Sequence, residues 1–117
     1  MGVGTLRELF RNLQAFRTAY ETDGLDTITG PDGVTYCLWD LEYLYGEIHR
    51  LSPRQRQAIE LCLVANLKEV GVATMMGLSP TNPVAMYATL GLKKLVEMID
   101  SGELPRYREH ASAAEVA

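Results

Sequence analysis

Residues 51–95 read LSPRQRQAIELCLVANLKEVGVATMMGLSPTNPVAMYATLGLKKL, and this stretch decides the expected fold. It opens with a strong helix-start signal, because Ser52 can cap the helix, Pro53 suits the first helical position and Gln55 completes a capping box. The pattern predicts a helix that runs to about Asn66. Its buried face should carry the apolar residues at helical spacing, namely Ala58, Ile59, Cys62 and Leu63.

Two further helices are expected after it, a short one at about 68–76 and a long one at about 83–101. The turn between them contains Gly77, which can adopt the left-handed backbone conformation that ends a helix. The next residue, Leu78, is apolar and suits the gap between the two helices. Two helices joined by such a turn are the pattern of a helix-turn-helix.

The same stretch resembles region 4 of bacterial sigma factors. LSPRQRQAIEL is similar to the opening helix of that family, LKEVGVATMMGLSP to the first motif helix and its turn, and VAMYATLGLKKL to the recognition helix. Together they resemble the small sigma-like proteins of actinobacterial phages, whereas residues 1–50 do not look like sigma regions 2 or 3. The resemblance implies a transcription regulator that binds promoter-like double-stranded DNA, RNA polymerase, or both.

The turn departs from the family pattern, because SPTNPV holds one residue more before its Val. Pro83 lacks an N–H and cannot sit inside a helix, so we expect the recognition helix to begin at Pro83 with Asn82 as its cap. The candidate DNA-binding residues are the basic and polar side chains that this arrangement implies, namely Arg54, Arg56, Lys68, Thr81, Asn82, Thr89 and Lys93.

Two structural explanations compete with that assignment. Arg54 and Arg56 are equally compatible with an ordinary solvated helix face. Lys93 and its neighbour Lys94 lie in the C-terminal half of the last helix, where cations complement the helix dipole without any ligand.

The outward face of the last helix is poor in the side chains that read bases. If Val84 is buried, the helical period points Ala88, Gly91, Leu95 and Ile99 inward, and Met86, Thr89, Leu90, Lys93 and Glu97 outward. No Arg or Gln lies on that outward face, although direct base reading relies on such side chains. The alternative function is therefore a protein–protein interaction module, for dimerisation or for docking transcription machinery, with Met86, Tyr87 and Leu90 as partner-binding residues.

The N-terminal half predicts two more helices and a small β-hairpin. Residues 5–22 show apolar residues at helical spacing after a possible capping box of Thr5 and Glu8. Residues 26–37 alternate β-branched and polar residues around the turn signal GPDG, and residues 38–50 follow as a helix. The aromatic residues Trp39, Tyr43 and Tyr45 of this helix are expected in the core, where they would hold the hairpin to the helices, with a base-stacking surface as the alternative.

The whole chain of 117 residues is expected to form one compact, mainly α domain of about five helices. Within it, residues 1–50 pack on the core, residues 51–103 form the sigma-like unit, and residues 104–117 form a flexible tail. Residues 51–95 are the only net-positive block, with five basic against two acidic residues, whereas residues 1–50 carry four arginines against eight acidic residues. This distribution favours nucleic-acid contact at the sigma-like unit alone.

Other classes of protein are disfavoured by the sequence. No apolar run of membrane-spanning length and no secretory signal is visible, so a cytoplasmic protein is expected. His49 and His110 have no metal-ligating partners at a suitable spacing, and no nucleophile, base and orienting group assemble. We therefore expect neither an enzyme nor a cofactor, metal or small-molecule substrate.

Overall fold

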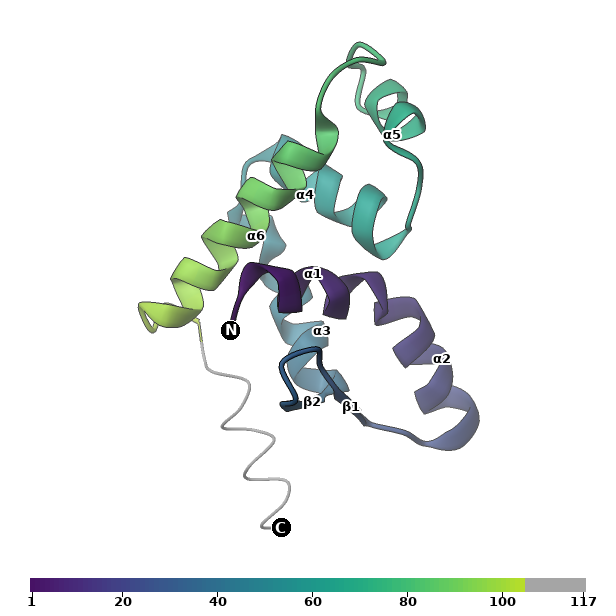
Figure 1. Ribbon diagram of the computed structural model, residues 1–117, viewed down its shortest axis with the longest axis vertical. Helices are drawn as coiled ribbons and strands as arrows, with labels where there is room; N and C mark the ends of the chain where they lie inside the picture. Colours follow the sequence, from purple (N-terminus) through teal and green to yellow (C-terminus); the bar gives the residue numbers. More distant parts are fainter. Residues whose placement is uncertain (105–117) are drawn as a thin grey trace.

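The computed structural model describes residues 1–104 and is mainly helical, with one small hairpin, as the sequence predicts (Figure 1). The expected tail lies outside the described residues apart from Leu104, which is buried in the core and so belongs to the folded unit. No helix in the described residues is long and apolar enough to span a membrane. The elements in chain order are α1 (Val3–Arg11), α2 (Leu13–Asp23), β1 (Thr27–Thr29), β2 (Thr35–Cys37), α3 (Leu38–Gly46), a 3-10 helix (Glu47–Arg50), α4 (Pro53–Ala58), a π-helix (Ile59–Val64), α5 (Glu69–Met75) and α6 (Val84–Asp100).

The start of α4 confirms the capping box. The Ser52 hydroxyl accepts a hydrogen bond from the Gln55 backbone N–H at 3.3 Å, and the Gln55 side chain accepts one from the Ser52 N–H at 3.4 Å. Pro53 is the first helical residue. The predicted single helix instead continues past Ala58 as the π-helix, and the chain turns at Asn66, whose φ of 55° is left-handed.

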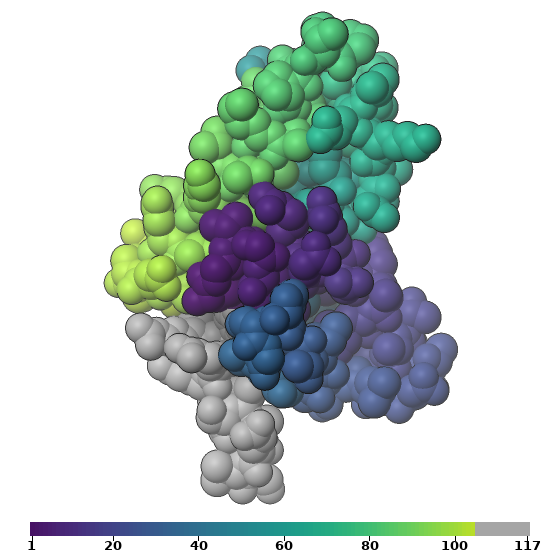
Figure 2. Space-filling model, in the orientation of Figure 1, coloured from purple at the N-terminus to yellow at the C-terminus, as the bar shows by residue number. Residues whose placement is uncertain are grey.

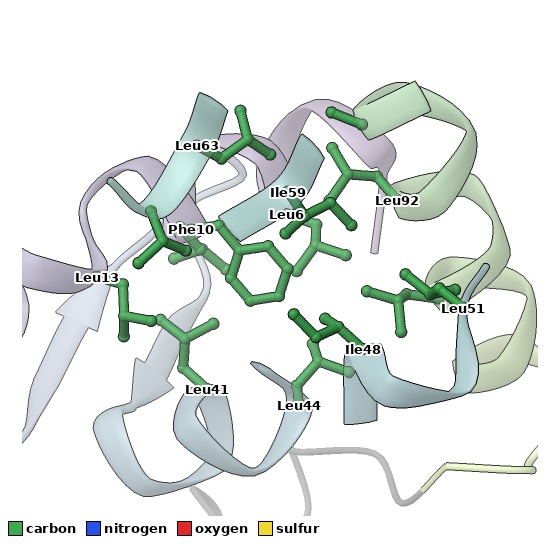
Figure 3. Close-up of a cluster of buried hydrophobic side chains, with 14 of the residues drawn as sticks. Leu6, Phe10, Leu13, Leu41, Leu44, Ile48, Leu51, Ile59, Leu63 and Leu92 are labelled. Carbon is green, nitrogen blue, oxygen red and sulfur yellow. The ribbon is translucent and has the colours of Figure 1, made fainter. Parts of the chain in front are cut away.

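We call residues 51–64, which include α4 and the π-helix, the α4 segment. Helix α6 crosses this segment closely, and the core forms around the crossing. A Cβ atom placed on Gly91 would lie 2.8 Å from Ile59 Cδ1 and 3.2 Å from Leu51 Cδ1, so the absence of a side chain permits the approach. Figure 3 shows Leu92 of α6 in the same cluster as Ile59, with Leu6 and Phe10 of α1 beside them. Helix α1 thus covers the core formed by α4 and α6.

The N-terminal helix differs from the prediction in two ways. It begins at Val3 without a side-chain cap, so the expected capping box of Thr5 and Glu8 is wrong. It also breaks at Asn12 into α1 and α2, and the Asn12 side chain donates to the Glu8 carbonyl at 2.8 Å. An Asn side chain that competes for backbone groups in this way disfavours a helix interior. Of the apolar residues at helical spacing in both parts, Tyr20 is exposed and the others are buried, namely Leu6, Leu9, Phe10, Leu13 and Phe16.

Of the three aromatic residues of α3, Tyr45 packs half-buried against the core, with its ring 5.7 Å from that of Phe10, whereas Trp39 and Tyr43 are not in the core as expected. Trp39 is 55% exposed and Tyr43 is 51% exposed, because they lie four residues apart on the face of α3 opposite Leu41 and Leu44. Trp39 instead makes an edge-to-face contact with the exposed Tyr20 of α2, at 5.0 Å between ring centroids. The prediction that these rings hold the hairpin in place is therefore wrong.

Tyr36 anchors the hairpin instead. Strands β1 and β2 pair antiparallel with Ile28 opposite Tyr36, as the alternation at 26–37 predicts. Tyr36 is buried, and its hydroxyl donates to Asp32 in the turn. Its ring lies so close to Gly30 that a Cβ there would come within 2.6 Å of it. One buried ring thus fixes both the turn and the hairpin's place on the helices.

The crossing at Gly91 gives a stability prediction. Gly91→Val should lower the free energy of unfolding by about 1–3 kcal/mol, because its side chain overpacks against the buried Ile59. The control Gly71→Ala lies in α5, where nothing occupies the space around the new methyl group, and should raise that free energy by up to about 1 kcal/mol. Urea unfolding of both variants measures the difference. Equal stability of Gly91→Val and wild type would contradict a close crossing.

Candidate functional site

The turn between α5 and α6 forms as the sequence predicts. Gly77 has a φ of 72°, and the Leu78 N–H donates to the Ala73 carbonyl at 2.8 Å, which closes the C-terminus of α5. Leu78 is half-buried against a small core of Val72, Ala73 and Val84. This core joins α5 to the first residue of α6, so the turn holds the two helices in a fixed relation.

The beginning of α6 differs slightly from the prediction. The helix starts at Val84 with Pro83 as the flanking residue, and Asn82 makes no side-chain cap. The Asn82 Oδ1 atom is buried without a hydrogen-bond partner within residues 1–104, so this oxygen is not exposed to a groove. Thr81 is exposed, and its hydroxyl lies 3.0 Å from that of Ser79. Of the two polar turn residues expected to contact DNA, Thr81 is exposed and Asn82 is half-buried.

The rotation of α6 agrees with the sequence pattern. The residues predicted to face inward are all buried, namely Val84, Ala88, Gly91, Leu95 and Ile99. Four of the predicted outward residues are exposed and follow one another along the helix. We call this set the α6 stripe, and it consists of Met86, Leu90, Lys93 and Glu97.

Thr89 is the one predicted outward residue that is not freely exposed. It is half-buried, and its hydroxyl accepts a hydrogen bond of 2.8 Å from the Arg7 guanidinium of α1. Helix α1 therefore lies along this side of α6, as Figure 2 shows where the purple N-terminal surface meets the green one. The sequence analysis missed Arg7. Its signal was the pair Arg7 and Arg11, one helical turn apart within an otherwise acidic half of the chain.

Arg54 and Tyr87 meet on the other side of α6. The Arg54 guanidinium lies 5.7 Å from the centroid of the Tyr87 ring and donates to its hydroxyl at 3.3 Å. Tyr87 is half-buried, so this predicted partner-binding residue is in part a core contact. With Leu90 and the first turn of α4, the pair lines a surface groove of about 490 Å³.

The remaining basic candidates are placed as follows. Lys68 and Lys93 are exposed, the first just before α5 and the second on the α6 stripe. Arg56 is half-buried on α4. The structure therefore brings basic groups to both sides of the α6 stripe, with Arg54 on the Tyr87 side and Lys68 on the side where α1 lies.

Exposed apolar side chains gather at the α5–α6 end of the molecule. Met86 is 55% and Leu90 43% exposed on α6, and Val70 and Met75 are each more than 60% exposed on α5. Leu67, just before α5, is also exposed. The sequence analysis singled out only the two α6 residues, because the short α5 has too few turns to reveal which of its faces is buried.

The Cys62 thiol lies near α5 and is half-buried. Burial raises the pKa of the Cys62 thiol, and the nearby Glu69 raises it further, so this thiol stays protonated at neutral pH. Cys37 and Cys62 are both free thiols. Within residues 1–104, no group of three or more His, Cys, Asp or Glu side chains is arranged to hold a metal ion.

Comparison with known proteins adds no identification. No protein-family model matches the chain, and neither a curated protein nor a solved structure matches it.

The rotation of α6 gives a second prediction. Leu95→Ala should lower the free energy of unfolding by about 2–5 kcal/mol, because Leu95 is fully buried and its truncation leaves a cavity. Met86→Ala should change it by no more than about 0.5 kcal/mol, because this side chain is exposed. Thermal or urea unfolding compares the two variants. If Met86→Ala costs as much as Leu95→Ala, Met86 belongs to the core and the α6 stripe is misassigned.

Proposed function

We propose that this chain is a transcription regulator that binds promoter-like double-stranded DNA through a sigma region 4-like helix-turn-helix of α5, the turn and α6. The observation that carries the proposal is the setting of the α6 stripe, which is exposed and has basic side chains on both sides. A helix in a major groove needs this arrangement, because cations beside the helix reach the phosphates that border the groove.

The side chains of the α6 stripe imply that the protein contacts mainly the phosphate backbone of the DNA. Thr89 is engaged by Arg7, and Asn82 is half-buried, so few groups remain for hydrogen bonds to bases. Met86 can pack against a thymine methyl group, and Lys93 can reach a guanine edge or a phosphate. Such an interface distinguishes sequences poorly by itself. Selectivity for a promoter then comes from a second contact, for which RNA polymerase is the natural partner.

The salt dependence of DNA binding tests this proposal. The predicted basic set of Arg54, Arg56, Lys68, Lys93 and Lys94 spreads over three elements, so about three phosphates should be neutralised. Each contributes about −0.9 to the slope of log affinity against log salt, which predicts a slope near −3. Fluorescence anisotropy with a labelled duplex of mixed sequence measures it. No binding at low salt would reject the proposal, and a slope beyond about −6 would require a dimer or a larger basic surface.

A second candidate function is protein docking, and the exposed apolar groups favour it. Met86 and Leu90 lie one turn apart on the α6 stripe, and Leu90 also lines the groove beside Tyr87. Burial of each side chain by a partner is worth on the order of 1–3 kcal/mol. A DNA groove covers such groups only at thymine methyls, whereas a protein surface covers them fully. In this candidate the partner is a second copy of the chain or a subunit of the transcription machinery.

The double variant Met86→Ser, Leu90→Ser distinguishes the two candidates. It should abolish self-association or docking to transcription machinery and leave the fold intact, because both side chains point to solvent. Light scattering reports self-association, and recovery of RNA polymerase subunits from nuclease-treated host lysate reports docking. Leu25→Ser is the control, because Leu25 is equally exposed but follows α2, away from this surface. If the double variant associates as wild type does but no longer binds DNA, the α6 stripe contacts DNA and not a protein partner.

A further inference from the structure

A cleft of about 470 Å³ lies where α1 meets α6 and the chain segment before α5. Its α6 wall is formed by Ala85, Ala88 and Thr89, on the side of the helix next to the α6 stripe. Figure 1 shows α1 passing below α6 and α5. The polar side chains that line it are Arg7, Arg11, Asn66, Lys68, Glu69 and Thr89.

Positive charge dominates this lining. Arg7, Arg11 and Lys68 contribute three cations, against the single carboxylate of Glu69. Arg7 forms no ion pair within the described residues, and the only hydrogen bond of its side chain there is to the Thr89 hydroxyl. That bond fixes a half-buried guanidinium at the α6 wall of the cleft and leaves its other N–H groups free.

The Arg11 side chain forms only a weak ion pair within the described residues. It pairs with Glu8 at 3.1 Å, but both side chains are about half exposed. An exposed pair of this kind is worth little, so it yields readily to a better acceptor. Lys68 is exposed and forms no ion pair within residues 1–104. Three cationic side chains without strong partners therefore line the same cleft, Arg7 and Arg11 from α1 and Lys68 from the segment before α5.

A phosphate group matches these donors best, because guanidinium groups bind its oxygens with paired hydrogen bonds and Lys adds a point charge. We propose that this cleft binds one phosphate of the DNA backbone, so that α1 completes the nucleic-acid surface of α6. The inference rests on the proposed function. The position of the cleft argues for DNA as the source of the phosphate, because its α6 wall borders the stripe that would enter the groove.

The test measures duplex binding by variants that change the cleft charge. Arg7→Gln and Arg11→Gln should each weaken binding of a labelled mixed-sequence duplex about tenfold at low salt, as expected for loss of a hydrogen bond to a charged group. The double variant should also make the salt slope shallower by about 0.9, the contribution of one phosphate. Thermal unfolding checks that each variant is folded.

A matched pair of variants, each of which neutralises one acidic residue, tests the same cleft and keeps the hydrogen bond between Arg7 and Thr89. Glu8→Gln releases Arg11 and should tighten duplex binding roughly threefold, the range of an exposed ion pair. Glu21→Gln changes the net charge equally but lies on α2, away from the cleft, and should leave the affinity unchanged. Equal effects of the two would reduce the result to net charge and overturn the inference.

The remaining outcomes separate the inference from the proposed function. Duplex binding by Arg7→Gln and Arg11→Gln equal to that of wild type would overturn the phosphate site and leave the proposed function standing. Absence of duplex binding by wild type would overturn both. Titration calorimetry with inorganic phosphate tests the other source, a free phosphate compound. Saturable phosphate binding that Arg7→Gln removes, with duplex affinity unchanged, would overturn the assignment to DNA.

Discussion

The close approach of α6 to the α4 segment at Gly91 is the constraint on which the rest of the structure depends. A side chain at this position would meet Ile59 and Leu51, both of which belong to the main core. The helix that crosses here supplies buried residues from Val84 to Ile99 and so contacts both apolar clusters of the molecule. Tyr87 packs against both clusters, which ties the α5 unit to the main core.

Because the buried face of α6 is fixed in this way, the chemistry of its other faces is fixed too. One side receives Arg7 from α1, the opposite side receives Arg54 from α4, and the α6 stripe between them remains exposed. The N-terminal half is acidic as a whole, yet its arginines at α1 lie beside α6. The net charge of a sequence block is thus a poor guide to the charge beside a particular helix, because packing selects which side chains meet.

The sequence predicted well the features that depend on local chemistry. The capping box at Ser52, the left-handed Gly77 and the inward face of α6 all follow from spacing and backbone preference. The sequence did not predict features that depend on contacts between segments distant in the chain. The exposure of Trp39 depends on which face of α3 meets the core, and the engagement of Thr89 depends on Arg7, 82 positions away. No periodicity within one helix contains that information.

Base reading requires polar side chains on the α6 stripe, whereas protein docking requires apolar ones. The affinity expected from each contact decides how the two functions combine. Three phosphate contacts without base reading correspond to non-specific DNA binding, with dissociation constants on the order of 10⁻⁴ to 10⁻⁶ M at physiological salt. Alone, that is too weak to select a promoter among competing sites. An apolar contact to a partner already held at the promoter makes the DNA contact intramolecular, which raises the overall affinity by a factor of about 10² to 10⁴. For the proposed function, basic groups beside the stripe and apolar groups on it therefore suit the binding of DNA and a protein partner together better than the binding of either alone.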